Sequence, residues 1–233
     1  MITPRLQAVM DLAEGERIAD IGTDHAYIPI QLALEGRIKK AIAADKNTGP
    51  IKIAEENIKK YSLGDIIDTR VGDGLDCIKS GEADTVIIAG MGGKLIGDII
   101  ERDIIKARSS TLILQPMNAQ YELRKRLFSL GFKIEREQLA KEGFKVYNII
   151  KAVSGQDIIK EEIDYHLPKE LYSHPLFKLL AAKKEREFKK IINGMKKSDT
   201  GDIKIINKYE ALLSELYKIV FIGDCKIQSQ FEV

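Results

Sequence analysis

The feature that most constrains the fold of this chain is an alternation of short apolar runs with amphipathic segments. The runs lie at 17–22, 40–45, 66–71, 84–90, 110–116, 132–139 and 145–153. Between the first six, apolar residues recur at three- and four-residue spacing, which predicts helices. These helices are expected at 26–36, 49–60, 93–106 and 119–130. Strands and helices in alternation predict a mainly parallel sheet with both faces covered.

The last two runs are joined differently from the others. The loop LAKEGFK at 139–145 is typical of a hairpin, so one strand is expected to be antiparallel. The predicted fold class is therefore α/β, with a Rossmann-like, seven-stranded sheet formed by residues 1–153.

After Val153 the sequence shows two amphipathic stripes and no strand pattern. The first contains Phe177, Leu180, Lys184, Phe188, Ile191 or Ile192, and Met195, and the second contains Ile206, Tyr209, Leu213, Leu216 and Val220. The polar turn SDTGD lies between them, where Ser198 or Asp199 is expected to cap the second helix. Residues 154–233 are therefore predicted to form an α-helical hairpin, or short coiled coil, as a separate domain.

Basic residues concentrate in the first of these helices. The whole chain has a formal net charge of only +2, but residues 168–197 contain nine Lys or Arg and three Asp or Glu. Two interpretations stay open, a solvated helix face and a surface that contacts phosphates. The candidate nucleic-acid contacts are Lys183, Lys184, Arg186, Lys189 and Lys190.

Cysteine usage and hydropathy limit the class of protein. Cys77 and Cys225 form neither a disulfide framework nor a metal-ligand set, so no metal is expected and both thiols are expected to be reduced. The chain starts without the apolar core of a signal peptide, and no stretch reaches the roughly 18 apolar residues of a membrane helix. A soluble, cytoplasmic protein is expected.

The first strand ends in a sequence suited to a cationic ligand. In Ile18-Ala19-Asp20-Ile21-Gly22-Thr23-Asp24-His25-Ala26, the glycine permits a tight turn and the small alanine lets a helix pack close to the sheet. Two carboxylates, Asp20 and Asp24, would repel a pyrophosphate, which disfavours NAD. They would attract the ammonium and sulfonium groups of S-adenosylmethionine.

Acidic residues also follow the second and third strands. Asp45 can accept hydrogen bonds from both ribose hydroxyls, and Lys46 adjoins it. Asp73, with Gly74 shaping the turn, can accept from an adenine amino group. Each carboxylate alone could be a helix cap or a loop residue. Three of them at successive strand ends favour one ligand site at the carboxyl edge of the sheet.

The fourth and fifth strands end in Ala89-Gly90-Met91-Gly92-Gly93 and Gln115-Pro116-Met117-Asn118. Three glycines in four residues are costly unless the backbone must approach something closely, so the target and the methyl donor are expected to meet here. A simple helix-entry loop is the alternative. Asn118 could bind the edge of a base or cap the helix that follows it.

Assembled in order, these residues resemble the bacterial tRNA (adenine-22-N1)-methyltransferase family, TrmK. The matching stretches are ADIGTDHAYIPI (19–30), AADKNTGPIKIAEENI (43–58), RVGDGL (70–75), IIAGMGGKLI (87–96) and LILQPMNAQYELRKRL (112–127). They span the N-terminal domain, whereas the C-terminal hairpin resembles the family's coiled-coil appendage in its amphipathic pattern and not in its sequence. In the family Asn often follows Gln-Pro directly, but here Met117 intervenes.

The resemblance implies a class I methyltransferase that uses S-adenosylmethionine to methylate N1 of adenine 22, in the D-arm region of tRNA. It implies cofactor positions at Asp20, Gly22, Asp24, Asp45, Lys46, Asp73, Gly74, Ala89, Gly90, Met91 and Gly92. Asp24, His25 and Asn118 would face the target, with Asp24 as the favoured catalytic carboxylate. A small-molecule methyltransferase and a non-catalytic RNA-binding module are the alternatives. The oligomeric state stays open, and a monomer is compatible with the sequence.

Overall fold

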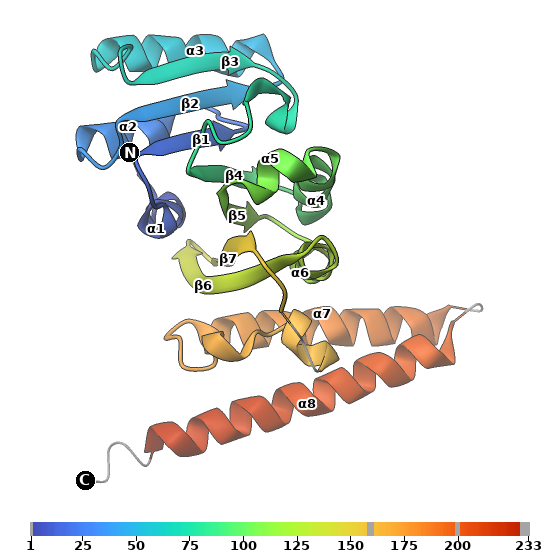
Figure 1. Cartoon of the computed structure of the whole chain (residues 1–233). Coiled ribbons are helices and arrows are strands. Elements are labelled where there is room, and N and C mark those ends of the chain that lie inside the picture. Colours follow the sequence, from blue (N-terminus) through green and yellow to red (C-terminus); the bar gives the residue numbers. More distant parts are fainter. Residues whose placement is uncertain (1, 158–160, 199–200, 229–233) are drawn as a thin grey trace. The chain divides into compact units, whose positions relative to one another are not determined.

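The computed structural model describes residues 2–157, 161–198 and 201–228, with the backbone alone at 222–228. The chain divides into two compact units, Met1–Ile158 and Ile159–Val233 (Figure 1). Among the described residues, no helix combines the length and the apolar character needed to cross a membrane.

The first unit contains a seven-stranded sheet in the order β3-β2-β1-β4-β5-β7-β6. Its strands are β1 (Arg17–Ile21), β2 (Lys40–Asp45), β3 (Ile67–Val71), β4 (Thr85–Met91), β5 (Thr111–Pro116), β6 (Phe132–Glu142) and β7 (Lys145–Ser154). Strands β1 to β5 are parallel, and β7 is antiparallel to both β5 and β6. The predicted Rossmann-like sheet and its single antiparallel strand are confirmed.

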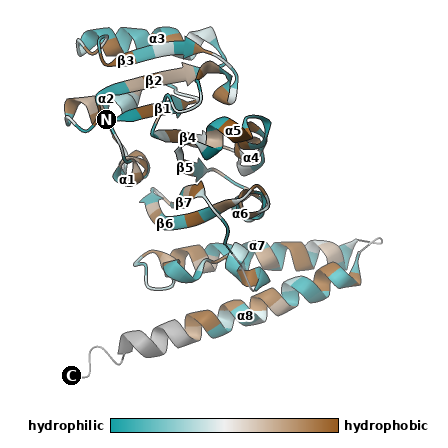
Figure 2. Ribbon diagram, in the orientation of Figure 1, coloured by the Kyte–Doolittle hydropathy of each residue, from teal (hydrophilic) through white to brown (hydrophobic). Residues whose placement is uncertain are grey.

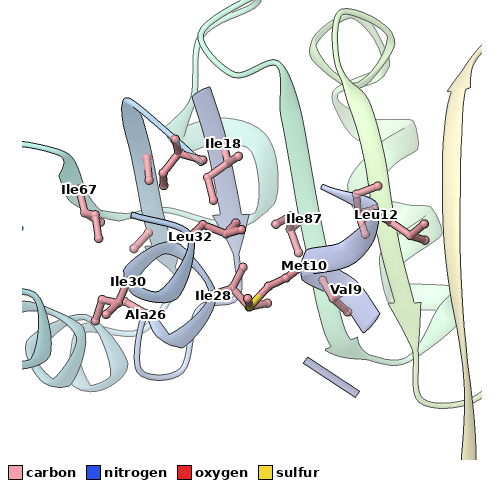
Figure 3. Close-up of a cluster of buried hydrophobic side chains, with 14 of the residues drawn as sticks. Val9, Met10, Leu12, Ile18, Ala26, Ile28, Ile30, Leu32, Ile67 and Ile87 are labelled. Carbon is pink, nitrogen blue, oxygen red and sulfur yellow. The ribbon is translucent and has the colours of Figure 1, made fainter. Parts of the chain in front are cut away.

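Helices cover both faces of this sheet (Figure 1). One face carries α1 (Pro4–Leu12), α2 (Tyr27–Leu34) and α3 (Thr48–Lys60), and the other carries α4 (Gly93–Arg102), α5 (Ile104–Arg108) and α6 (Gln120–Ser129), with a short helix η1 (Gly74–Cys77). Alternate strand residues supply the two cores. Ile18 and Ile87 face α1 and α2 (Figure 3), whereas Ile21 and Ile88 face the opposite way.

Two helices differ from the prediction. The single helix expected at 93–106 is wrong, because the chain leaves helical geometry at Asp103, where φ is −120° and ψ is 47°. An aspartate favours such a break, since its side chain competes with the helical backbone for hydrogen bonds. Helix α1 was not predicted. It begins after Thr3, whose Oγ1 accepts a hydrogen bond from the backbone N–H of Leu6 at 3.4 Å.

The second unit is a pair of long helices, α7 (Phe177–Lys197) and α8 (Ile203–Gln228), preceded by the short helices η2 (Glu162–Tyr165) and η3 (Lys169–Leu171). Figure 2 shows hydrophobic residues recurring along α7 and α8 between hydrophilic ones. The Phe188 ring of α7 makes an edge-to-face contact with the His166 ring, with centroids 5.0 Å apart. It also packs against the Tyr209 ring of α8, with centroids 5.5 Å apart. The predicted helical hairpin is therefore present.

The expected cap of the second hairpin helix is in a different place. Asp202 Oδ1 accepts a hydrogen bond from the backbone N–H of Lys204 at 2.8 Å, at the first turn of α8. Ser198 instead follows the last residue of α7, so its predicted capping role is wrong, and Asp199 lies outside the described residues. The turn SDTGD supplies four candidate caps, two aspartates, a serine and a threonine, and the last aspartate is the one adjacent to the helix.

A buried ionic network joins α6 to the β6–β7 hairpin. Arg124 donates to Glu137 through Nη2 and through Nε, the latter at 3.1 Å, and Asn148 Nδ2 donates to the same carboxylate at 2.8 Å. The side chains of Arg124 and Glu137 are both almost fully buried. Removing one charge would break this buried pair, which is strongly destabilising.

We therefore expect Glu137→Leu to lower the free energy of unfolding by about 3–5 kcal/mol, because the buried Arg124 guanidinium would lose its bonds to the Glu137 carboxylate. The double variant Arg124→Met/Glu137→Leu should recover most of this loss. Urea denaturation followed by circular dichroism measures both. A loss below about 1 kcal/mol in the single variant would contradict a charge-paired interior here.

Candidate cofactor and substrate site

The turn after β1 forms the floor of the candidate site. Gly22 has φ +78°, and the backbone N–H groups of Gly22 and Thr23 both donate to the carbonyl of Ala44, at 2.8 and 2.9 Å. A Cβ atom at Gly22 would lie 1.9 Å from Met91 Cε. The turn is therefore tied to the end of β2 and packs against Met91 at the end of β4, and its positive φ favours glycine.

Asp20 is a buried carboxylate behind this turn, and its side chain is 6% exposed. Its Oδ2 accepts a hydrogen bond from Thr23 Oγ1 at 2.7 Å, and the same hydroxyl accepts from the backbone N–H of Ala26 at 3.2 Å. Burial raises the pKa of Asp20 to about 6, and the Thr23 hydroxyl opposes this only in part. Within the described residues no cationic side chain pairs with Asp20.

Sequence reasoning missed Thr23, which is buried and holds both the Asp20 carboxylate and the start of α2. A hydroxyl residue three positions after a strand-end aspartate was the available signal.

Asp45 lies at the carboxyl end of β2, half-buried. Its Oδ1 accepts hydrogen bonds from the backbone N–H and the side-chain amide of Asn47, at 2.7 and 3.1 Å. Among the described residues nothing bonds to its Oδ2. One carboxylate oxygen thus fixes the loop that leads into α3, and the other remains for a ligand. Lys46 is exposed beside it.

Asp73 follows β3 and is engaged by a residue that the sequence did not suggest. Arg102, at the end of α4, donates to Asp73 Oδ2 at 3.0 Å and to its backbone carbonyl at 2.5 Å. Gly74 begins the helix η1 beside this pair, and a Cβ on it would lie 2.6 Å from the Arg102 guanidinium. Asp73 therefore ties the loop after β3 to the end of α4, and its hydrogen bond to adenine stays a prediction.

Asp24 projects from the turn before α2, with its side chain 80% exposed. His25 Nε2 lies 3.3 Å from Asp24 Oδ2, and the His25 ring stacks on Tyr27 with centroids 5.0 Å apart. Asn57 Nδ2 donates to the His25 carbonyl at 3.1 Å. Tyr27 is exposed. The structure thus groups a carboxylate, an imidazole and an aromatic ring.

The loops after β4 and β5 are bonded to each other. The half-buried Ala89 and Met91 flank a register shift at Gly90, and the backbone N–H of Met117 donates to the Met91 carbonyl at 2.8 Å. The backbone N–H of Gly93 donates to the Asn118 carbonyl at 3.1 Å. A Cβ on Gly93 would lie 2.5 Å from the Ala119 carbonyl oxygen, so the glycine permits this close approach.

Asn118 is exposed next to Gly92, and its Oδ1 lies 3.2 Å from the position a Cβ would take there. Helix α6 starts after Ala119, which adopts a left-handed conformation with φ +53°. No described group bonds to the Asn118 side chain, so the alternative that it caps α6 is wrong. Its amide is available to a ligand.

Arg5, from α1, lies next to this pair of loops and was not predicted. Its Nη1 donates to Gln115 Oε1 at 2.7 Å, and its Nε donates to Glu142 Oε2 at 3.3 Å. Gln115 Oε1 also accepts from the backbone N–H of Gly90 at 3.2 Å. Because the N-terminal helix was not recognised in the sequence, nothing connected Arg5 to a site 110 residues away.

The predicted nucleic-acid contacts on α7 divide into two groups. Lys184 is 4% exposed, and its Nζ donates to Glu187 Oε2 at 2.7 Å. The prediction that it contacts nucleic acid at the surface is therefore wrong. It occupies the apolar stripe between Leu180 and Phe188. Lys189 is exposed but pairs with Glu185 at 2.7 Å.

Lys183, Arg186 and Lys190 lie three and four residues apart on one face of α7. Lys197, a further seven residues on, continues this row. Arg186, Lys190 and Lys197 are exposed and Lys183 is half-buried. Among the described residues, none of the four side chains forms a hydrogen bond or an ion pair. We refer to these four residues as the basic row.

The described residues contain no cluster of three or more His, Cys, Asp or Glu side chains arranged to hold a metal ion.

Comparison with protein families relates the first unit to methyltransferases. A family model described as a methyltransferase domain matches residues 2–150. The tRNA (adenine(22)-N(1))-methyltransferase of Bacillus subtilis is 38% identical over 157 residues. This alignment spans 66% of each chain, just under two thirds of the relative's length.

Solved structures extend the similarity over both units. The crystal structure of the Bacillus subtilis m1A22 tRNA methyltransferase TrmK has a TM-score of 0.84 and 29% identity, covering 94% of this chain and 99% of that chain. A Streptococcus pneumoniae protein assigned as a tRNA (m1A22) methyltransferase, in complex with S-adenosyl-L-methionine, has a TM-score of 0.79 and 32% identity. That alignment covers 91% of this chain and 100% of the other.

The raised pKa of Asp20 predicts a pH-dependent stability. The folded carboxyl has a pKa of about 6, and its ordinary value is 3.8, so the unfolded chain binds fewer protons between these values. Stability should therefore fall as pH rises from about 4 to about 6, by about 3 kcal/mol in total. Asp20→Asn removes this ionisation while its amide oxygen can still accept from Thr23.

We expect Asp20→Asn to be more stable than the parent chain at pH 8, by up to about 3 kcal/mol, and equally stable at pH 4. Urea denaturation at the two pH values measures the difference. A variant less stable than the parent at pH 8 would show that the ionised carboxylate is already compensated within the protein.

Proposed function

Because this chain belongs to the tRNA (adenine-22-N1)-methyltransferase family, we propose that it transfers a methyl group from S-adenosylmethionine to N1 of adenine 22 in tRNA. One observation carries the cofactor part of this proposal. Asp20 is a buried carboxylate with a raised pKa and no cationic partner among the described residues. A ligand that brings its own positive charge to the strand end would compensate it.

The residues around Asp20 fit such a ligand. Gly22 makes the tight turn that follows Asp20, and Asp45 keeps one carboxylate oxygen unbonded at the next strand end. We propose that Asp20 lies near the ammonium group, where Asp24 is the alternative contact, and that Asp45 accepts from the ribose. The other cofactor contacts in the proposal are Gly22, Lys46, Asp73, Gly74, Ala89, Gly90, Met91 and Gly92.

When bound, S-adenosylmethionine supplies a methyl group on a positively charged sulfur. Adenine N1 has an in-plane lone pair, so the protein need not remove a proton to create the nucleophile. As the N1–methyl bond forms, the methyl–sulfur bond breaks with its electron pair, and positive charge passes to the base. The chain must hold the reacting atoms in line at roughly 3 Å, which is worth more than acid–base chemistry here.

Asp24 is the residue that we propose for the developing charge. A carboxylate beside the methylated base stabilises that charge and can accept a proton from the amino group. His25, 3.3 Å from it, would orient the carboxylate. Asn118, whose amide has no protein partner among the described residues, would donate to or accept from the base edge. The base must leave its stack, since N1 is hidden in a Watson–Crick pair.

The division of labour between the units is also a proposal. Residues 1–153 would bind the cofactor and catalyse, and residues 154–233 would contact tRNA through the basic row, reading shape and phosphates. A small-molecule methyltransferase would share the cofactor loops but would leave the basic row without a role. A tRNA substrate implies a cytoplasmic enzyme, and a monomer suffices for this scheme.

The direct test is incubation of the protein with labelled S-adenosylmethionine and bulk bacterial tRNA, followed by nucleoside analysis for 1-methyladenosine. Asp24→Asn should lower kcat by roughly 10- to 100-fold, because it removes the charge near the base. Its affinity for S-adenosylmethionine should stay close to that of the parent chain. Label in a small molecule but not in tRNA would contradict the proposal, and weakened cofactor affinity would instead make Asp24 a contact of the ammonium.

The basic row predicts a salt-dependent tRNA affinity. Charge reversal in Lys183→Glu/Lys190→Glu should weaken tRNA binding and lower the slope of log K against log salt by about 1 for each lost phosphate contact. The matched control Lys59→Glu/Lys60→Glu makes the same charge change on α3. A filter-binding series at several salt concentrations compares them. Equal tRNA affinities of the two variants would refute a specific role for the row.

A further inference from the structure

The turn between β6 and β7 presents an aromatic side chain fully to solvent. Gly143 and Phe144 form a two-residue hairpin loop, with Glu142 paired to Lys145. Gly143 has φ +57°, as the first central residue of a type II′ turn requires. Phe144 is 106% exposed, more than any other large hydrophobic residue in the described chain. The loop therefore holds a large apolar ring away from the protein.

This turn lies at the carboxyl edge of the sheet, where the candidate site is. Strand β7 runs antiparallel to β5, with Leu114 opposite Ile150, so its first residues extend past the end of β5 at Pro116. Hydrogen bonds make the same connection, because Glu142 accepts from Arg5 and Arg5 donates to Gln115. Gln115 in turn accepts from the backbone N–H of Gly90. A chain of three hydrogen bonds thus connects the turn to the glycine-rich loop that begins at Gly90.

The charge around Phe144 is positive. Lys141 and Lys145 are both exposed on either side of the turn, and neither has a partner among the described residues. The only acidic residue in the turn, Glu142, is half-buried and paired with Arg5. An exposed aromatic ring between two unpaired lysines is suited to a nucleic-acid strand, since bases stack on rings and phosphates attract ammonium groups.

We propose that the β6–β7 turn contacts tRNA beside the target adenine, with Phe144 stacked on an unpaired base and Lys141 and Lys145 facing phosphates. This proposal rests on the proposed function and deepens it by adding a contact next to the reacting base. When the target adenine leaves its stack, a neighbouring base loses a stacking partner, and the Phe144 ring replaces it. The turn would thereby help to keep the target extruded.

The turn is suited to stacking on a base because the Phe144 ring is held in position before tRNA binds. A type II′ turn fixes its backbone, and the long β6–β7 pairing from Phe132 to Ser154 anchors it to the sheet. Little conformational freedom is then lost when a base stacks on the ring, which favours binding. A protein partner for the same ring is disfavoured by the two flanking lysines, since lysine is depleted in protein interfaces.

The test is steady-state methylation of tRNA by the parent protein and by Phe144→Ala. The variant should lower kcat/KM for tRNA about 10-fold, as loss of one stacked base predicts. Its affinity for S-adenosylmethionine and its thermal stability should equal those of the parent, because the ring contacts solvent only. Phe144→Trp should restore activity, and Phe144→Leu, which keeps an apolar side chain but no ring, should not. Lys141→Ala/Lys145→Ala should lower the salt dependence of tRNA binding.

Tyr61→Ala is the matched control. Tyr61 is an exposed aromatic residue that follows α3, with Lys60 Nζ 5.9 Å from its ring, at the opposite edge of the sheet. Its removal should leave kcat/KM unchanged.

The outcomes separate this proposal from the one on which it rests. A parent protein that methylates no tRNA refutes the proposed function itself. An active parent with an equally active Phe144→Ala variant overturns the role of the turn alone. A concentration-dependent dimer that Phe144→Ala abolishes, with unchanged kcat/KM, would assign the ring to a second copy of the chain and also overturn the proposal.

Discussion

The whole arrangement depends on the cost of burying the Asp20 carboxylate. A charge in the interior is tolerated only when another group compensates it, and within the described chain the Thr23 hydroxyl is the side chain that bonds to Asp20. The protein therefore keeps a carboxyl whose pKa is raised to about 6 at the end of its first strand. Such a group destabilises the isolated protein, and we propose that it is retained because the positive charge of the cofactor compensates it.

The surrounding loops make this edge rigid enough for precise placement. Backbone hydrogen bonds join the turn after β1 to β2, and the loop after β4 to the loop after β5. Arg5 connects α1 to these loops as well, because it donates hydrogen bonds to Gln115 at the end of β5 and to Glu142 in the β6–β7 hairpin. Segments separated by more than 100 residues therefore act as one frame. Methyl transfer to an unprotonated nitrogen depends mainly on such positioning, since no strong base is needed.

The strands could be predicted because they are buried on both faces, so each is an almost continuous apolar run ending in turn residues. The approximate position of the candidate site was predicted on similar grounds, since parallel strands bring their carboxyl ends to one edge. Pairings between distant residues could not be predicted. Asp73 meets Arg102 and Arg5 meets Gln115 only after the sheet has formed. Lys184 was misassigned because one residue satisfies two patterns, a basic run and an apolar stripe, and only burial decides between them.

The most direct test of the central claim is the number of protons released when S-adenosylmethionine binds at pH 6. Isothermal titration in two buffers of different ionisation enthalpy measures it. If the ligand's positive charge compensates Asp20, the carboxyl loses its proton on binding, and about half a proton per cofactor is released, a release that Asp20→Asn abolishes. Binding with no proton release, or with the same release in Asp20→Asn, would contradict the account.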